Sequence, residues 1–471
     1  MIVLFKQLRS IILSNLQQVK AKGSFAQNFA ISLSGSVIVT ALGFLLTPVM
    51  ARIYTPAAYG QFAVFNSIIS NLGLLSTMAY PNAIPLPKTK DKALALLQLI
   101  LVLSFGYFVL SSIACLVFGK WIMDRMQVTA ISYWFYSIPV ILLLFNLSMA
   151  MNSWYTRTKE FKTRAGNDVL TSVAGRLFTL GYGFFVSGQV AGLVIGDIFS
   201  KTTLFIGLLR SGIYRELGEM RRSFSWKAIR AVAREYREFP LYMLPGGYIN
   251  TLSAQLPIFL LTSSFGSTVV GLYSFSVSLL EIPVNLIGNA VAPVFYQKAS
   301  ETYNDNPGGL KDITLQIFNK LLYIGLLPFG IITIYGDVIF KFVFGARWEM
   351  AGVFTGYLGY YYIFKLTSQS TASIYTVLGK QRYMLLTNVL LLLVRAAALG
   401  IGIYMKDVNT GLLLFGIGSL VAVFMIDMHI LHLLKLPVVR IGLRSLLLMG
   451  GTILVLKLSR VAFEYLSINA F

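Results

Sequence analysis

Apolar runs of about 20 residues recur along the whole chain, separated by short polar segments. A helix of that length crosses the roughly 30 Å of hydrocarbon in a bilayer, and only helices or closed barrels satisfy every backbone polar group in lipid. The sequence therefore predicts an all-α polytopic membrane protein with twelve helices and a thirteenth after them. The runs lie at residues 25–50, 60–82, 93–118, 130–152, 166–187, 189–209, 241–263, 269–294, 313–335, 350–375, 383–404, 409–432 and 441–463.

The composition supports this class and argues against a nucleic-acid partner. Of the 471 residues, 56% are hydrophobic and 12% are charged, far more apolar surface than a soluble core of this length requires. The net charge of +21 comes mainly from basic residues in short gaps between apolar runs, so membrane topology explains it better than nucleic-acid binding does. The one cysteine, Cys115, lies inside an apolar run and forms no intrachain disulfide.

The positions of the basic residues predict an orientation, because Lys and Arg are enriched in cytoplasmic loops. We expect a cytoplasmic N-terminus, with residues 1–24 forming an interfacial helix on the inner face. Most of the 39 Lys and Arg residues then lie inside, and the outer loops carry only Arg52, Lys120, Arg125, Lys341, Arg347 and Lys406. If residues 441–463 span the membrane, the C-terminus is outside.

The two halves of the chain resemble each other. Tyr59-Gly60-Gln61-Phe62 matches Val270-Gly271-Leu272-Tyr273, and Ser153-Trp154-Tyr155-Thr156 matches Ser373-Ile374-Tyr375-Thr376, at nearly constant offsets. Since each half holds an even number of runs, the repeats are predicted to be parallel, with substrate bound between them near the midplane. We expect two pseudo-symmetric six-helix bundles at 25–209 and 241–432, a connector at 210–240, and an extra helix and tail at 433–471.

The connector is rich in Lys, Arg and Glu. Trp226, Ile229, Val232, Ala233 and Tyr236 recur at helical spacing, which predicts an amphipathic helix at the inner leaflet. We favour a linker anchored by anionic lipid, and docking of a cytoplasmic partner is the alternative.

Five basic residues fall inside the predicted spans: Arg176, Lys201, Lys320, Lys365 and Arg395. Such residues normally face a cavity or a partner, because their burial in lipid is costly. Arg176 and Arg395 occupy nearly equivalent positions of the two repeats. Two guanidinium groups facing one central cavity would suit a diphosphate, to which the planar fork can bind bidentately. Lys365 would add to the same positive field; the alternative for the arginines is structural pairing with a neighbouring helix.

Carboxylates inside the spans are candidates for ion coupling. Glu281 has no basic residue within one helical turn, so it is a protonatable candidate, or an ion-pair partner of Arg176 or Lys365. Asp197 is a second candidate, although its spacing to Lys201 favours an intrahelical ion pair.

Signatures of catalysis, metals and cofactors are absent from the sequence. No G-x-x-x-x-G-K-[ST] phosphate loop occurs, which argues against ATP hydrolysis by this chain. Asp427, His429 and His432 lie near one another, but no further ligand is apparent, so we expect interfacial hydrogen bonding there. The short outer loops hold no constellation of catalytic residues. We therefore expect neither an enzyme nor a bound cofactor.

Two motifs resemble those of the Wzx-type flippases, in the polysaccharide-exporter branch of the MOP superfamily. They are Arg52-Ile53-Tyr54-Thr55-Pro56-Ala57-Ala58-Tyr59-Gly60-Gln61-Phe62 and Trp154-Tyr155-Thr156-Arg157-Thr158-Lys159-Glu160-Phe161-Lys162, followed by Val270-Gly271-Leu272-Tyr273-Ser274 and Phe344-Gly345. The resemblance covers about residues 25–432. The multidrug branch commonly carries an acidic residue in the first span, and this chain has none there.

The resemblance implies two bundles in a V around a positively charged cavity, in a bacterial inner membrane. The cargo would be a polyprenyl-diphosphate-linked oligosaccharide for O-antigen or capsule assembly, with a polysaccharide polymerase and a chain-length regulator as possible partners besides membrane lipids. Arg176, Arg395, Lys365 and Arg52 are the expected binding residues, and Glu281 and Asp197 the coupling candidates. The alternatives are a MATE-like multidrug or small-solute antiporter and a membrane glycan polymerase.

Overall fold

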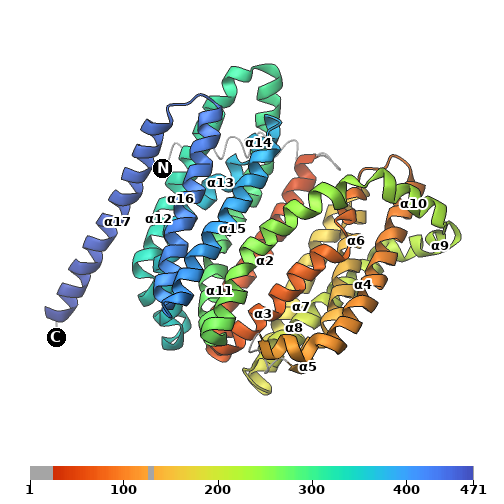
Figure 1. The fold of residues 1–471 in the computed structure, drawn as a ribbon, viewed down its shortest axis with the longest axis horizontal. Helices are drawn as coiled ribbons and strands as arrows, with labels where there is room; N and C mark the ends of the chain where they lie inside the picture. The colour runs from red at the N-terminus through yellow and green to blue at the C-terminus, as the bar shows by residue number, and fades with distance from the viewer. Residues whose placement is uncertain (1–24, 126–131, 470–471) are drawn as a thin grey trace.

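The computed structural model describes residues 25–125 and 132–469, which form helices and turns without strands. The predicted interfacial helix at residues 1–24 lies outside this described part. The long helices are α2 (Phe25–Ile53), α3 (Pro56–Ser76), α4 (Lys90–Arg125), α6 (Ile138–Arg157), α7 (Phe161–Phe185), α8 (Val190–Leu208), α11 (Leu244–Asp305), α12 (Leu310–Phe344), α13 (Glu349–Thr371), α15 (Gln381–Tyr404), α16 (Val408–Leu433) and α17 (Val438–Asn469) (Figure 1).

Shorter elements join these helices. They are η1 (Tyr80–Ala83), α5 (Ser132–Phe135), η3 (Leu209–Ile213), α9 (Tyr214–Arg222), α10 (Trp226–Glu235), η4 (Phe239–Met243), η5 (Pro307–Gly309), η6 (Ala346–Trp348) and α14 (Ser373–Val377). Nine helical stretches of the described residues are long and apolar enough to cross a membrane. The long helices α3, α7 and α13 fall outside that set.

Helix α11 contains two of the predicted runs. Gly266 has φ 83° and ψ 176°, which interrupts the helix at the boundary between them. Gly247 lies near Leu74 of α3, whereas Gly271 lies against Pro56 at the opposite end of α3. The first half of α11 thus runs antiparallel to α3, and the chain turns at Gly266. Glycine adopts the positive φ of this turn without steric cost.

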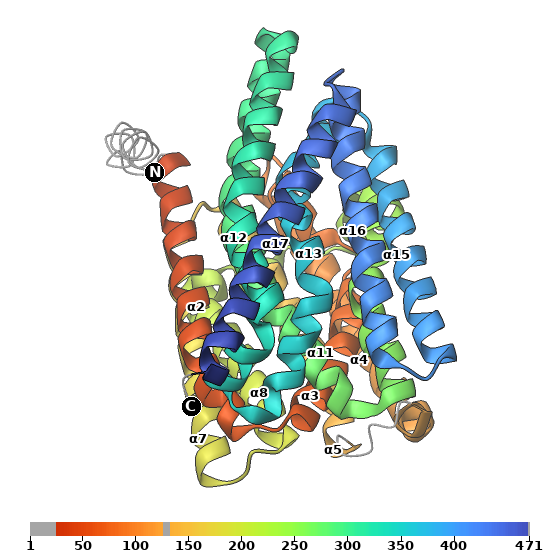
Figure 2. The same cartoon turned by 90° about the vertical axis from the view of Figure 1, so that its left-hand side faces the viewer.

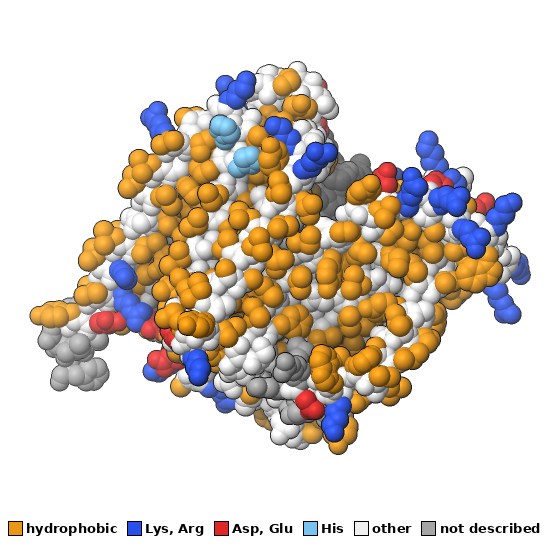
Figure 3. Space-filling model, in the orientation of Figure 1, with side chains coloured by type: hydrophobic (Ala, Val, Ile, Leu, Met, Phe, Trp, Pro, Cys, Tyr) orange, Lys and Arg blue, Asp and Glu red, His pale blue; other side chains and the backbone are white. Residues whose placement is uncertain are grey.

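The helices form two bundles side by side, as predicted. In Figure 1 the first bundle (red to yellow) lies on the right and the second (teal to blue) on the left, with α11 between them. In the first bundle α7 packs on α2 and α8, and α4 packs on α6; in the second, α13 packs on α12 and α16, and α16 on α15. A large part of the face shown in Figure 3 is covered by hydrophobic side chains, as expected for a protein surrounded by lipid.

The bundles meet closely at one end, which we call the far end, where α3 begins at Pro56. The opposite end, where α9 and α10 lie, we call the connector end. At the far end a Cβ on Gly60 would lie 1.8 Å from the Ser267 carbonyl oxygen, and one on Gly271 would lie 1.7 Å from that of Pro56. The contact is reciprocal, because Gly60 and Gly271 are equivalent positions of the two repeats, and so are Pro56 and Ser267. Only glycine permits this approach of two backbones.

An aromatic cluster completes the far-end contact. Trp348 is fully buried, and its Nε1–H donates a 2.7 Å hydrogen bond to the Ala51 carbonyl at the end of α2. The Tyr59 and Phe275 rings pack on Trp348 with centroids 5.2 and 4.1 Å away. Since Trp348 belongs to the second bundle and Ala51 to the first, this cluster joins the two.

The two sequence motifs have structural roles. Thr55 caps α3 by accepting a 3.2 Å hydrogen bond from the Ala58 N–H, and Pro56 follows as the first helical residue, where its missing N–H costs nothing. The buried Tyr54 hydroxyl donates to the Thr179 carbonyl at 2.6 Å. In the second motif, Tyr155 donates to the Leu208 carbonyl at 2.7 Å. These contacts fix helix ends to their neighbours.

The connector packs on the first bundle. Helix α10 is amphipathic, as predicted, but its apolar residues Ile229 and Val232 are buried against α4 rather than facing lipid. Two ion-pair groups reinforce this contact: Lys90 with Glu216 and Glu219, and Lys92 with Glu235.

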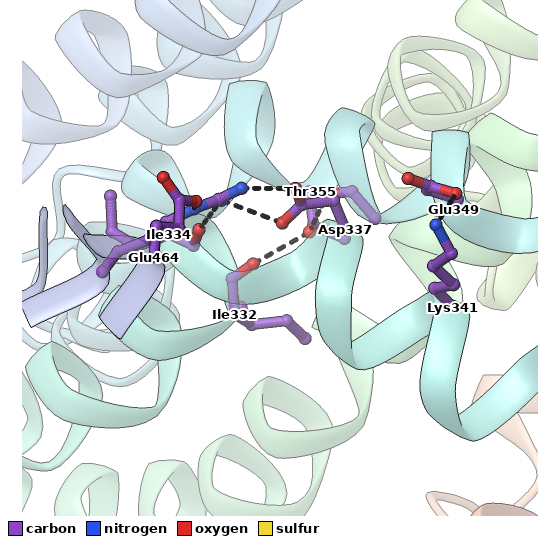
Figure 4. A network of polar contacts seen from close by, with 9 residues as sticks. Ile332, Ile334, Asp337, Lys341, Glu349, Thr355 and Glu464 are labelled. Carbon is purple, nitrogen blue, oxygen red and sulfur yellow. Dashed lines mark hydrogen bonds and ion pairs between the residues drawn. The ribbon is translucent and has the colours of Figure 1, made fainter. Parts of the chain in front are cut away.

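Helix α17 lies outside the second bundle, along α12 (Figure 2). It begins after α16 at the connector end and reaches the far end, where Arg460 forms a two-point ion pair with Asp337 of α12, at 2.9 and 2.7 Å. Arg460 also contacts the Ile334 carbonyl and Glu464. Figure 4 labels Ile334, Asp337 and Glu464 in this polar network. The thirteenth run is thus a full-length helix. It ends at the far end, whereas α2 begins at the connector end.

The glycine contact predicts the effect of adding one methyl group. Gly60→Ala should force α3 and α11 apart, because the new Cβ meets backbone rather than a movable side chain. We expect a loss of stability of about 1–3 kcal/mol, typical of overpacking, measured as a lower thermal unfolding midpoint. A cysteine introduced as Ala51→Cys, in a Cys115→Ala background, should also react faster with a maleimide when Gly60→Ala is present than when Gly60 is kept.

Gly106→Ala is the matched control, because a Cβ there meets nothing within 4 Å. If Gly60→Ala and Gly106→Ala give the same midpoint and the same labelling rate, the glycine contact does not hold the far end closed.

Candidate functional site

A cavity of about 760 Å³ lies within the first bundle, among α2, α3, α7 and α8. One wall is formed by α7, from Arg164 near the connector end to Thr179 near the far end. At 1.5 Å per residue this wall is about 22 Å long, most of the hydrocarbon thickness. We call this the main cavity; it is lined by Gly35, Ser36, Val39, Thr40, Met50, Phe62, Arg164, Ala165, Asp168, Thr171, Ser172, Gly175, Arg176, Thr179, Leu193, Gly196, Asp197 and Ser200.

Arg176 is the deepest cation of the main cavity. Its Nε–H donates to Ser172 Oγ at 3.2 Å, one turn earlier on the same helix. Gly43 of α2 lies opposite, and a Cβ there would be 2.7 Å from an Arg176 amino nitrogen, so the glycine leaves room for the guanidinium. Within the described residues no carboxylate forms an ion pair with Arg176. Its remaining N–H donors are available to an anionic ligand.

The other charges of the main cavity have both signs. Arg164 and Asp168 lie on α7 toward the connector end, and Asp197 lies on α8. Asp197 pairs with Lys201, which confirms the predicted intrahelical ion pair. Asp168 adds a second carboxylate, so the main cavity carries both signs and lies within the first bundle, whereas we expected a positively charged cavity between the two bundles.

Arg395 lies elsewhere, in the second bundle. It is 9% exposed, its amino group donates to Ser253 at 3.1 Å (Oγ) and 3.3 Å (carbonyl), and its guanidinium lies 5.4 Å from the centroid of the Phe415 ring. The two pseudo-equivalent arginines therefore have different surroundings: Arg176 faces a cavity, and Arg395 contacts protein groups.

Lys365 and Arg52 are also outside the main-cavity lining. Lys365 of α13 forms an ion pair with Glu281 of α11, one of the two partners considered for that carboxylate. Glu281 accepts a second hydrogen bond from the Tyr362 hydroxyl at 3.0 Å. Arg52 is exposed at the far end, where its carbonyl accepts a hydrogen bond from Arg347.

The cluster at Asp427 is held by hydrogen bonds, as we expected. The buried Asp427 carboxylate accepts from Thr367 at 2.5 Å and from Thr371 at 3.0 Å. His429 shares a 2.8 Å hydrogen bond with Tyr375. Among the described residues, no group of three or more His, Cys, Asp and Glu side chains could hold a metal ion.

The sequence analysis missed Arg164 and Asp168. The sequence nevertheless carries a signal for them, because Arg164, Asp168, Ser172 and Arg176 recur at every fourth position. Residues at this spacing lie on one face of a helix. A polar stripe inside an apolar run is the signal that could have identified the wall of the main cavity.

The pair of Lys365 and Glu281 gives a testable prediction. Both side chains are about a quarter exposed, so removing either partner leaves a poorly solvated charge. Glu281→Gln and Lys365→Met should each lower the thermal unfolding midpoint, whereas the double variant should lower it by less than the sum. We expect a coupling free energy of about 1–3 kcal/mol from this double-mutant cycle.

The exposed pair of Lys341 and Glu349 is the matched control, where Lys341→Met should cost at most about 1 kcal/mol. Additive effects of Glu281→Gln and Lys365→Met would show that the two side chains do not stabilise each other.

Known proteins share the fold of this chain. The lipid II flippase MurJ, in an inward closed conformation, matches with a TM-score of 0.68 at 12% identity, over 93% of this chain and 99% of that one. A multidrug resistance MATE transporter of the MOP superfamily matches in an inward-facing conformation with a TM-score of 0.64 at 16% identity, over 90% and 98%.

An outward-facing conformation of a MATE family transporter matches with a lower TM-score of 0.58, at 14% identity, over 87% of this chain and 95% of that one. No curated protein sequence matches the chain at a significant level. Residues 49–352, more than half of the chain, match the family described as polysaccharide biosynthesis protein. The chain therefore belongs to the polysaccharide biosynthesis protein family and has the fold of the MOP superfamily.

Proposed function

We propose that this protein is a flippase that moves polyprenyl-diphosphate-linked oligosaccharide units from the cytoplasmic to the outer leaflet of a bacterial inner membrane. The observation that carries the proposal is Arg176, a guanidinium without a carboxylate partner among the described residues, deep in a 760 Å³ cavity. A diphosphate supplies oxygens that match its donors. The family match to polysaccharide biosynthesis supports a glycan cargo.

The arrangement of the bundles supports transport by alternating access. The far end is closed by the contact of Gly60 with Gly271 and by Trp348. We infer that the connector end faces the cytoplasm, because Lys and Arg are enriched in cytoplasmic loops. In our proposal the headgroup enters the main cavity from the cytoplasm while the prenyl chain remains in lipid. Separation of the far-end contacts then exposes the headgroup to the outer face.

Coupling and downstream steps extend this proposal. Asp197, which lines the main cavity, and Glu281 remain the coupling candidates, and each would have to exchange its lysine partner for a proton or another cation. Transport itself requires no covalent chemistry. The unit delivered to the outer leaflet would be consumed by a separate polysaccharide polymerase whose product length a regulator controls, for O-antigen or capsule.

A multidrug antiporter is the second candidate function. Asp168 and Asp197 place carboxylates in the main cavity, which would suit an organic cation. Efflux of cationic drugs from a sensitised strain, abolished by Asp168→Asn, would favour this function over lipid transport.

Replacement of Arg176 tests the flippase proposal. In proteoliposomes loaded with lipid-linked oligosaccharide from the source strain, Arg176→Ala should slow flipping roughly 10- to 100-fold, the effect of losing a charged hydrogen bond of about 1.5–3 kcal/mol. Arg176→Lys should restore part of the rate, because it returns the charge without the planar fork.

Lys320→Met is the matched control: it removes a basic residue from a membrane helix, α12, but Lys320 is exposed outside the main cavity. Normal flipping by Arg176→Ala would rule out this role for the main cavity.

A further inference from the structure

A second cavity, of about 430 Å³, lies at the connector end of the first bundle. We call it the side cavity. It is bordered by α6, by Leu204 of α8 and by the chain around η1. Its lining residues are Pro81, Asn82, Pro85, Phe145, Ser148, Met149, Asn152, Ser153, Thr156, Arg164 and Leu204.

The side cavity combines polar and apolar groups and is nearly uncharged. Its polar groups are the amides of Asn82 and Asn152 and the hydroxyls of Ser148, Ser153 and Thr156, and among the described residues Arg164 is its one charged lining residue. Ser148, Asn152 and Thr156 recur every fourth residue on α6, so they form a stripe on one face. Amides and hydroxyls both donate and accept hydrogen bonds. Such a lining suits a neutral ligand rich in hydroxyl groups.

Two atoms of this stripe lack partners. Within the described part of the chain, Ser148 Oγ and Asn152 Oδ1 are buried and make no hydrogen bond, and the Ser148 side chain is only 3% exposed. A buried polar atom without a partner costs about 1–3 kcal/mol. Thr156, in contrast, accepts from the Arg164 guanidinium at 3.1 Å. The unpartnered positions therefore point to a ligand that completes their hydrogen bonds.

The two cavities meet at Arg164, which lines both. On α8, Ser200 lines the main cavity and Leu204, one turn later, lines the side cavity. Arg164 lies twelve residues before Arg176 on α7, about 18 Å along the helix axis. A headgroup bound at Arg176 would need to extend toward the connector end to reach the side cavity, as an oligosaccharide of several sugars does.

We propose that the side cavity is the subsite that recognises neutral sugars of the lipid-linked oligosaccharide, with Ser148 and Asn152 as specificity-determining residues. This inference rests on the proposed flippase function. The hydroxyl and acetamido groups of a sugar supply donors and acceptors to the unpartnered atoms, and Phe145 and Met149 provide apolar surface for the C–H face of the ring. A site built this way discriminates strongly against a ligand that lacks the matching groups.

Binding to two probes tests the subsite. The full chain in nanodiscs is titrated with bare polyprenyl diphosphate and with the same lipid carrying its oligosaccharide, extracted from the source strain. The wild-type protein should bind the glycan-bearing lipid at least tenfold more tightly. Ser148→Ala combined with Asn152→Leu should remove most of that difference and leave the affinity for the bare lipid unchanged, which also shows that the variant is folded.

Ser112→Ala is the matched control, since that hydroxyl bonds to its own helix and lines neither cavity. If the double variant keeps the preference for the glycan, or if the wild-type protein binds both lipids equally, the subsite is refuted while the flippase proposal stands. If the wild-type protein binds neither lipid, the flippase proposal fails and the subsite with it.

Discussion

The two bundles depend on a contact between backbones. In lipid no hydrophobic force drives one helix toward another, so close packing of small residues must supply the attraction. Gly60 and Gly271 provide it twice, each against the carbonyl of the other repeat. Because the contact joins equivalent residues, the two repeats of the sequence meet pseudo-symmetrically at the far end. Both cavities lie within the first bundle, apart from this contact between the bundles.

The helices could be predicted because each needs an apolar run long enough to cross the same thickness of hydrocarbon. Even the interruption of α11 at Gly266 falls between two predicted runs. The packing of α10 on α4 could not be predicted, since an amphipathic pattern shows that one face is buried but not whether lipid or protein covers it. Here Ile229 and Val232 contact protein.

The partners of the charged residues were also only partly predictable from the sequence. The pair of Asp197 and Lys201 follows from helical spacing, whereas Glu281 and Lys365 come together across 84 residues, a distance that no local pattern encodes. Arg176 and Arg395 are equivalent in the sequence but not in their surroundings, because Ser253 and Phe415 engage only the second. The two repeats share an order of helices, but Arg176 and Arg395 each contact side chains of their own bundle, and those side chains differ.

Helix α17 has a consequence for how the molecule is assembled. Among the described residues it lines neither cavity, yet it carries Arg460, which pairs with Asp337 of α12. A cation in an apolar helix is costly without a partner, so the Asp337 carboxylate stabilises α17 in this position. The ion pair thereby makes the docking of α17 depend on the folding of α12.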